Sequence, residues 1–182
     1  MQLVITPMRR RHLRAIQRIQ ADDPHGGWSV GLWLAELRRE TGRAYAVAQV
    51  GRQVVGYGGL LIQHDDAHVT TLGVAGTHRG LGVGSRLLAA LVRRGLAEGA
   101  HNLTLEVRAT NEPAIQLYRR FGLAPAGVRK NYYQDLGEDA LIMWAHDIDT
   151  DAYRARLDAL DDELERRAAA AGTTVITEGF DT

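Results

Sequence analysis

A cluster of glycines is the feature that most constrains this chain. Five glycines fall between residues 73 and 84, directly after an apolar run and directly before a helical pattern. A strand that ends in such a bend and opens a helix leaves several backbone N–H groups without intrahelical partners, and the helix dipole adds positive potential there. Glycine permits the positive φ angles of the bend and lets a ligand approach the backbone closely. The pattern predicts a strand, bend and helix unit that binds an anion such as a phosphate.

Two common phosphate-binding motifs do not fit this bend. A Walker A loop requires a lysine beside its last glycine, and the only lysine of the chain is Lys130. A dinucleotide-binding fingerprint that starts at Gly80 requires glycine at position 85, where Ser85 stands. The pattern that remains is Arg79-x-x-Gly82-x-Gly84.

Length and composition limit the remaining possibilities. A chain of 182 residues that is 45% hydrophobic can fill one core, so we expect one domain with a tail. The 22 basic and 22 acidic residues balance, which favours neither nucleic acid nor an anionic membrane as a partner. The absence of cysteine excludes disulfides, thiolate zinc sites and a cysteine nucleophile. No apolar run approaches a membrane span, and we expect a cytoplasmic protein.

Periodicity predicts an α/β fold in which strands and helices alternate. Alternating apolar residues predict strands at residues 2–6, 44–50, 54–63, 68–74, 102–107, 123–129 and 140–147. Helical spacing predicts a helix from Pro7, a second after Ser29, a third from Gly82 to Glu98 and a fourth from Pro113 to Gly122. We expect residues 1–148 to form one domain.

Residues 149–182 are predicted to be a C-terminal helical extension. Its apolar seam recurs at helical spacing on an otherwise charged sequence, at Tyr153, Leu157, Leu160 and Leu164. We expect this seam to pack on its own domain, with weak dimerisation as the alternative. After Gly172 the sequence is short and polar, and we expect a mobile end.

Two further groups of residues carry chemistry. Glu106 ends a strand predicted to lie beside the glycine bend, and Tyr118 lies within the following helix. A strand glutamate can also be a solvated or salt-bridged residue, and a helical tyrosine near Phe121 can belong to the core. Farther on, the chain reads Arg129-Lys130-Asn131-Tyr132-Tyr133 and then Glu138-Asp139-Ala140, which can also be a basic, aromatic hairpin without a ligand.

Together, these segments resemble the GNAT superfamily of N-acetyltransferases, and in particular its RimI-type ribosomal-protein N-terminal-alanine acetyltransferases. The resemblance implies a mixed sheet of about six to seven strands with about four helices, and acetyl-CoA as the acetyl donor. It makes Glu106 the general base and Tyr118 the general acid. The residues implied in coenzyme binding are Leu72, Gly73, Val74, Arg79, Gly80, Leu81, Gly82, Val83, Gly84, Ser85 and Asn111. Those implied in acceptor binding are Trp28, Tyr132 and Tyr133.

The chemistry of the acceptor favours a protein N-terminus. An α-amine with a pKa of about 7.7 to 8.0 is roughly a tenth free at neutral pH, whereas lysine near about 10.4 is far less so. One carboxylate base, contributing roughly 10² to 10⁴ in rate, suffices for the former. We therefore expect direct acetyl transfer to a protein N-terminus, with the N-terminal alanine of small-subunit ribosomal protein eighteen implied by the resemblance.

Other readings of the sequence stay open. The chain could acetylate lysine, other protein N-termini or a small amine, or it could be a non-catalytic acyl-CoA-binding module. His64 and His68 flank a turn, a spacing that does not predict a metal site. We expect a monomer or a weak homodimer, with no direct contact to nucleic acid or membrane. The loop from Asp22 to Gly27 lies near the predicted entry of the acceptor.

Overall fold

An eight-stranded mixed sheet runs through the fold, and the computed structural model describes residues 1–23 and 27–180. The strands are β1 (Gln2–Pro7), β2 (Arg43–Val50), β3 (Gln53–Gln63), β4 (Asp66–Val74), β5 (Asn102–Arg108), β6 (Ala124–Tyr133), β7 (Glu138–Ala145) and β8 (Thr174–Thr177). The helices are α1 (Leu13–Ala21), α2 (Val30–Glu36), α3 (Val83–Ala97), α4 (Glu112–Arg120) and α5 (Asp151–Ala170). Short 3₁₀ turns cover Arg10–His12, Gly76–His78 and Gln134–Leu136.

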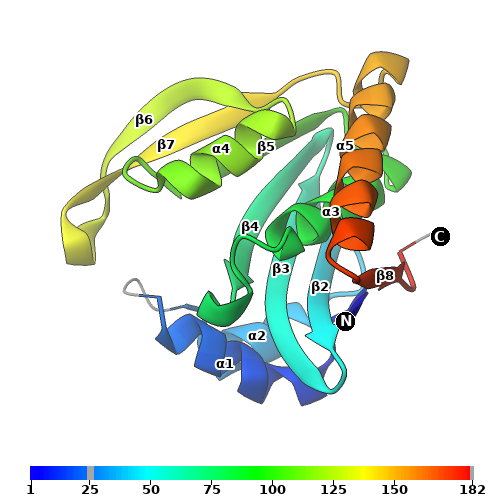
Figure 1. The fold of residues 1–182 in the computed structure, drawn as a ribbon. Helices are drawn as coiled ribbons and strands as arrows, with labels where there is room; N and C mark the ends of the chain where they lie inside the picture. The colour runs from blue at the N-terminus through cyan, green and yellow to red at the C-terminus, as the bar shows by residue number, and fades with distance from the viewer. Residues whose placement is uncertain (24–26, 181–182) are drawn as a thin grey trace.

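The strand order is β6-β7-β5-β4-β3-β2-β1-β8 (Figure 1). The β4·β5 and β1·β8 pairs are parallel and the other neighbours are antiparallel. The predicted α/β fold is confirmed, with β8 as a strand that the sequence did not predict. The first predicted helix is present as α1, but its predicted start is wrong, because Pro7 ends β1 opposite Ala46 and α1 begins only at Leu13.

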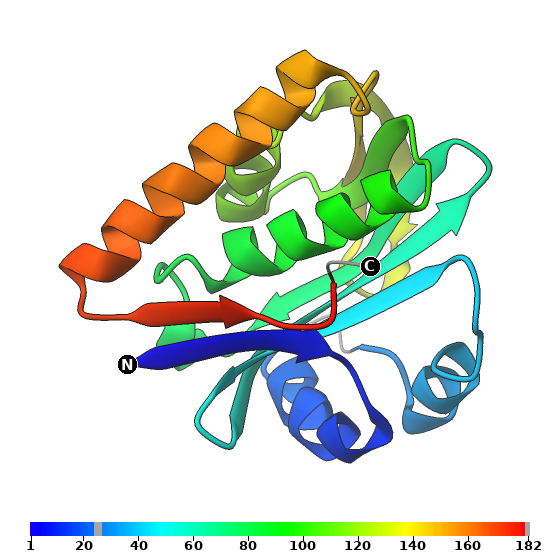
Figure 2. The same cartoon turned by 90° about the vertical axis from the view of Figure 1, so that its right-hand side faces the viewer.

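Helices cover both faces of the sheet, with α3 and α5 on one face and α1 and α2 on the other (Figure 2). Successive side chains of β2 point to opposite faces of the sheet and join the core on each side. Ala44, Ala46 and Ala48 join the core beneath α3, whereas Tyr45 and Val47 pack with the aromatic and aliphatic residues of α1 and α2. The sheet is therefore buried on both sides through its middle strands.

Small residues let α3 lie close to the sheet. A Cβ atom added at Gly56 would come within 3.0 Å of Leu87, and one at Gly58 within 2.8 Å of Leu91. Larger side chains at these two positions would push α3 outward. Because α3 begins at the glycine bend, its close packing determines where the first turn of the helix points.

β4 and β5 diverge halfway along their length, as Figure 1 shows for the two halves of the sheet. They are paired from Asp66 with Asn102 to Val69 with Leu105, and beyond these residues β4 stays paired only with β3 and β5 only with β7. The register with β3 shifts at the same place, because Gly59 pairs with Thr71 and the next residue pairs with Val69. Thr70 is thus an extra residue in β4, and such a β-bulge bends its strand. The bulge accounts for the gap that opens between β4 and β5.

The C-terminal extension packs on the domain, as the seam predicted. Tyr153, Leu157, Leu160 and Leu164 are all buried. The expectation of a mobile end is wrong for Thr174–Thr177, which forms β8 beside β1 (Figure 2). Two half-buried apolar residues in this short segment, Val175 and Ile176, give it a reason to pair. Within the described chain, no helix is long and apolar enough to cross a membrane.

Candidate active site

The glycine bend presents free amides to one side of the fold. Gly80 and Gly82 have φ angles of 77° and 82°, a region that other residues rarely adopt. The first backbone hydrogen bond of α3 runs from Arg86 N–H to the Gly82 carbonyl. The N–H groups of residues 83–85 therefore lie free in the first helical turn, where the helix dipole favours an anion. This is the geometry that the sequence predicted for a phosphate site.

A second set of amides lines the gap between β4 and β5. Ala75 N–H donates to the Val55 carbonyl at 2.9 Å, so Val74 falls in a non-hydrogen-bonded pair with β3. By the same alternation, the N–H groups of Leu72 and Val74 point away from β3 and into the gap. Both residues lie beyond Val69, where β4 no longer pairs with β5. These amides can hydrogen-bond a carbonyl oxygen placed in the gap.

A cleft of about 570 Å³ joins the bend to this gap. Most of the residues that the sequence assigned to the coenzyme line it: Leu72, Gly73, Val74, Arg79, Gly80, Gly82, Val83, Gly84, Ser85 and Asn111. Leu81 does not line this cleft. It is 58% exposed and borders a separate hollow beside α5. Ten other residues, which the sequence assigned neither to the coenzyme nor to catalysis, also line it: Asp22, Asp23, His78, Arg108, Pro113, Ala114, Gln116, Leu117, Arg120 and Arg167.

Tyr118 and Asn111 enter the cleft from α4. Asn111 is the N-cap of the helix, and its side-chain oxygen accepts a hydrogen bond from Ala114 N–H at 3.3 Å. Tyr118 is buried but lines the cleft. Burial, and then the neighbouring Tyr133, raise the pKa of the Tyr118 phenol, which keeps its proton at neutral pH. Its hydroxyl makes no hydrogen bond to the part of the chain that the structure describes.

Glu106 lies on the opposite face of β5 from the core residues Leu105 and Val107, directly after the last pair with β4. Its carboxylate is held by two cations or potential cations. Oε2 is 2.6 Å from Nε2 of His68 on β4, and Oε1 is 3.2 Å from the Arg129 guanidinium on β6. These three side chains border a second hollow, of about 360 Å³, which shares no lining residue with the main cleft. The carboxylate is therefore both held in place and open to solvent.

Tyr133 links the two halves of the site. Burial, then Tyr132 and then Glu106 raise its pKa, and Tyr133 in turn contributes to the raised pKa of Tyr118. Tyr133 therefore interacts electrostatically with both the Glu106 carboxylate and the Tyr118 phenol. Tyr132 is 46% exposed, stands edge-on to Tyr133 at 5.2 Å and carries the Arg129 guanidinium over its ring at 5.5 Å. Neither tyrosine lines the main cleft.

Trp28, which the sequence assigned to acceptor binding, packs against other aromatic side chains of the fold. Its ring is partly buried and lies 4.6 Å from that of Trp33, against the aromatic core of α1 and α2. The loop from Asp22 to Gly27 was predicted to lie near the entry of the acceptor. Its residues 24–26 lie outside the described residues. Asp22 and Asp23, at the start of this loop, line the main cleft. Asp23 also adds to the raised pKa of Tyr133 at the end of β6.

Among the residues near the site whose role the sequence did not indicate, His68 and Arg167 bear most on the chemistry. For His68 a signal existed, since strand alternation and the parallel pairing with β5 can place it on the face of Glu106. For Arg167 the sequence carried no such signal, because this residue lies on α5, far from the motifs in sequence. Only the packing of α5 brings it to the cleft.

The chain resembles known acetyltransferases in sequence and in structure. Residues 11–123 match the model of the acetyltransferase (GNAT) family. The chain belongs to this family. It is 37% identical over 137 residues, 75% of this chain and 91% of the relative, to a Bacillus subtilis protein provisionally named a [ribosomal protein bS18]-alanine N-acetyltransferase. It is 34% identical over 131 residues to the Mycobacterium tuberculosis N-alpha-acetyltransferase RimI, covering 70% of this chain and 78% of that one.

Solved GNAT structures agree. The Escherichia coli ribosomal-protein-S18-alanine N-acetyltransferase superposes with a TM-score of 0.71 at 26% identity, covering 80% of this chain and 94% of that one. Ard1 from Thermoplasma volcanium superposes with a TM-score of 0.72 at 25% identity, covering 79% and 97%. The resemblance to RimI-type enzymes and the prediction of an acetyl-CoA-dependent N-acetyltransferase are confirmed at the level of the family.

The residues of this GNAT enzyme fit acetyl-CoA. The free amides of residues 83–85 suit the coenzyme diphosphate, and the amides of Leu72 and Val74 suit the thioester carbonyl. The cleft between them is continuous and contains several arginines, including Arg79 and Arg108. Arg79 also donates from Nε to the Val74 carbonyl at 3.2 Å, which ties the bend to the end of β4.

Proposed function

We propose that this enzyme acetylates the α-amine of a protein N-terminus, and that the acceptor is the N-terminal alanine of ribosomal protein bS18. The relatives from Bacillus subtilis and Escherichia coli named for that acceptor support the substrate. The lower pKa of an α-amine supports an N-terminus over lysine, because one carboxylate base can supply the free amine. A ribosomal acceptor would place the reaction in the cytoplasm.

The observation that carries this proposal is the arrangement of Glu106 and Tyr118 about the gap. Glu106 is the first residue of β5 beyond its pairing with β4, and Tyr118 lines the cleft that fills the same opening. Tyr133 interacts electrostatically with both. A base on one side of a reacting carbonyl and an acid on the other are what direct acyl transfer to an amine requires.

Glu106 is assigned the role of general base. Its carboxylate accepts a proton from the incoming ammonium and frees the nitrogen lone pair. Once Glu106 is protonated, His68 in its Nδ1–H tautomer can accept the proton from Oε2 on Nε2 and release the Nδ1 proton to the open hollow, so that the carboxylate returns to its starting state. Arg129 holds the other oxygen and keeps the carboxylate oriented.

Tyr118 and the β4 amides complete the proposed mechanism. Acetyl-CoA supplies a thioester whose carbonyl carbon the free amine attacks. The Val74 N–H donates a hydrogen bond to the carbonyl oxygen as it gains negative charge. Tyr118 donates its phenolic proton to the departing sulfur, a role that suits a phenol whose pKa is raised by burial.

Acidic and aromatic residues are assigned to the acceptor. Asp22 and Asp23 line the cleft and would attract the positive N-terminus toward Glu106. Tyr132 and Tyr133 at the end of β6 are placed to border the acceptor backbone. Trp28 supports the acceptor side through the aromatic core rather than by an open ring.

Turnover on matched peptides tests the proposal. Peptides that begin with the bS18 N-terminal alanine are mixed with acetyl-CoA and the release of CoA is measured. We expect turnover with the free N-terminus and none when that alanine is already acetylated, even where lysines are present. Turnover on the blocked peptide would instead indicate lysine acetylation, and tight acetyl-CoA binding without turnover on any amine would indicate a binding module.

Glu106→Gln tests the base. We expect kcat to fall by roughly 10² to 10⁴, with the Kd for acetyl-CoA unchanged. Glu40→Gln is the matched control, because Glu40 is exposed and lies outside the cleft. An unchanged kcat in Glu106→Gln would overturn this assignment.

A further inference from the structure

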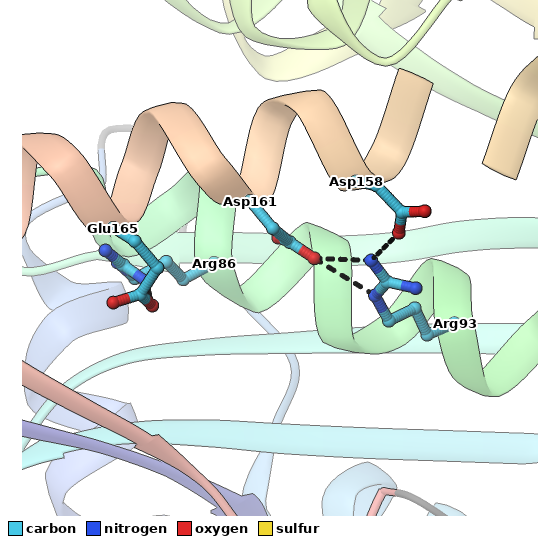
Figure 3. A network of polar contacts seen from close by, with 5 residues as sticks. All are labelled: Arg86, Arg93, Asp158, Asp161 and Glu165. Carbon is cyan, nitrogen blue, oxygen red and sulfur yellow. Dashed lines mark hydrogen bonds and ion pairs between the residues drawn. The ribbon is translucent and has the colours of Figure 1, made fainter. Parts of the chain in front are cut away.

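The C-terminal helix α5 lies outside the family match at residues 11–123, yet it is fastened along α3. Its buried seam includes Leu157 and Leu164, which are 1% and 2% exposed. Ion pairs flank the seam (Figure 3): Arg86 lies 3.0 Å from Glu165, and Arg93 lies 2.9 Å from Asp158 and 2.5 Å from Asp161.

The end of α5 reaches the glycine bend. Arg86, in the first turns of α3, donates to the Leu164 carbonyl with its guanidinium buried beneath α5. A Cβ atom added at Gly82 would lie 3.4 Å from Cδ2 of Leu164. The helix therefore packs directly against the bend that presents the free amides.

Two arginines from different helices line the coenzyme cleft near this contact. Arg167 comes from α5 and Arg120 from the end of α4. Both share one carboxylate, since Glu163 is 2.9 Å from Arg120 and 3.8 Å from Arg167. One negative charge cannot neutralise two guanidinium groups, so this end of the cleft keeps a positive charge. Arg167 is 55% exposed and Arg120 is 33% exposed, which puts both on the outer rim.

We propose that Arg167, assisted by Arg120, binds the 3′-phosphate on the ribose of coenzyme A. The free amides of residues 83–85 account for the diphosphate, and the 3′-phosphate is the remaining anionic group of the coenzyme, at the end opposite the thioester. Guanidinium groups bind phosphate oxygens through paired, charge-assisted hydrogen bonds. The C-terminal helix is thus part of the coenzyme site. This inference rests on acetyl-CoA binding at the bend, and depends neither on the acceptor nor on the role of Glu106.

Calorimetric titration of the full chain with acetyl-CoA and with acetyl-3′-dephospho-CoA tests the inference. We expect the unmodified protein to bind acetyl-CoA about tenfold or more tightly than the dephospho form, the effect of one charge-assisted hydrogen bond. Arg167→Gln should weaken acetyl-CoA binding by a similar factor and leave the affinity for the dephospho form unchanged. Arg166→Gln is the matched control, because Arg166 is exposed on the same helix and lies outside the cleft.

A third variant tests whether the positive charge of Arg120 and Arg167 attracts the 3′-phosphate. Glu163→Gln removes the competing carboxylate and should strengthen binding of acetyl-CoA but not of the dephospho form. Equal binding of the two donors by the unmodified protein, or an equal loss for both in Arg167→Gln, would overturn the inference. Because binding is measured without an acceptor, a failure of acetyl transfer with normal discrimination between the donors would count against the proposed function alone.

Discussion

Nε2 of His68 lies 2.6 Å from Oε2 of Glu106, across the last paired stretch of β4 and β5. His68 lies on β4, two residues before the β-bulge at Thr70. The same parallel ladder that ends at Leu105 therefore sets the distance between the proposed base and a group that can carry its proton away. His68 is one-third exposed, so its ring connects the carboxylate to solvent.

His68→Gln should lower kcat by about tenfold, an order-of-magnitude share of the roughly 10² to 10⁴ attributed to acid–base catalysis. Glutamine can keep a hydrogen bond to Glu106 but cannot relay a proton. KM for acetyl-CoA should stay constant, because the coenzyme cleft does not include His68. Steady-state kinetics across pH measure both effects. His64→Asn is the control, since His64 lines the same hollow and asparagine tolerates its φ of 54°. An equal effect of the two variants would refute the relay.

Gly82→Ala should destabilise the fold by about 1–2 kcal/mol and weaken acetyl-CoA binding. Gly82 has a φ of 82°, which alanine adopts only with strain, and Leu164 leaves the new methyl group little space. Gly76→Ala is the matched change in the same segment. Gly76 is not among the glycines with positive φ and has no atom within 4 Å of an added Cβ, so its effect should stay within about 0.5 kcal/mol. Urea unfolding and calorimetry distinguish the two, and equal destabilisation would contradict the prediction.

The apolar seam of α5 should hold the extension more firmly than its ion pairs. Leu157 is 1% exposed, and Leu157→Ala should cost about 2–5 kcal/mol through lost burial and a cavity. Arg93 is 43% exposed, so solvent screens its pairs, and Arg93→Ala should cost at most about 1 kcal/mol. Urea unfolding of both variants gives the comparison. A larger loss for Arg93→Ala would show that the network in Figure 3 dominates.

Buried tyrosines should make the fold sensitive to alkali. Burial raises the pKa of Tyr118 and Tyr153, so the folded chain keeps their protons at a pH where the unfolded chain loses them. This contribution is fully present below the unfolded pKa of about 10 and is lost as pH rises above it. The free energy of unfolding should therefore decline between about pH 10 and pH 11.5.

Tyr153→Phe provides the control for this effect. The Tyr153 hydroxyl donates to the Phe121 carbonyl at 2.8 Å and has a raised pKa, and the substitution removes it. The variant should lose less stability over the same alkaline range, since one titrating group is gone. Urea unfolding at several pH values measures the slope. A slope that is flat, or identical in the two proteins, would contradict the assignment.

Much of the fold could be predicted because it depends on local patterns. Alternation in β5 and the seam in α5 each place apolar residues on one side, and the structure buries both. The N-caps Ser29 and Asn111 act through hydrogen bonds within three residues. β8 could not be predicted, because its four residues gain stability only from pairing with β1 at the other end of the chain.

The sequence by itself determined the glycine bend before α3, since glycine spacing, positive φ angles and the free amides of a helix start are all local properties. Tertiary structure alone decided what surrounds that bend. The bulge at Thr70 opens the gap, the β4–β5 ladder sets His68 against Glu106, and the packing of α5 brings Arg167 to the cleft. The last two of these contacts join residues 38 or more positions apart, and no local spacing encodes any of the three, because they depend on how separate elements pack.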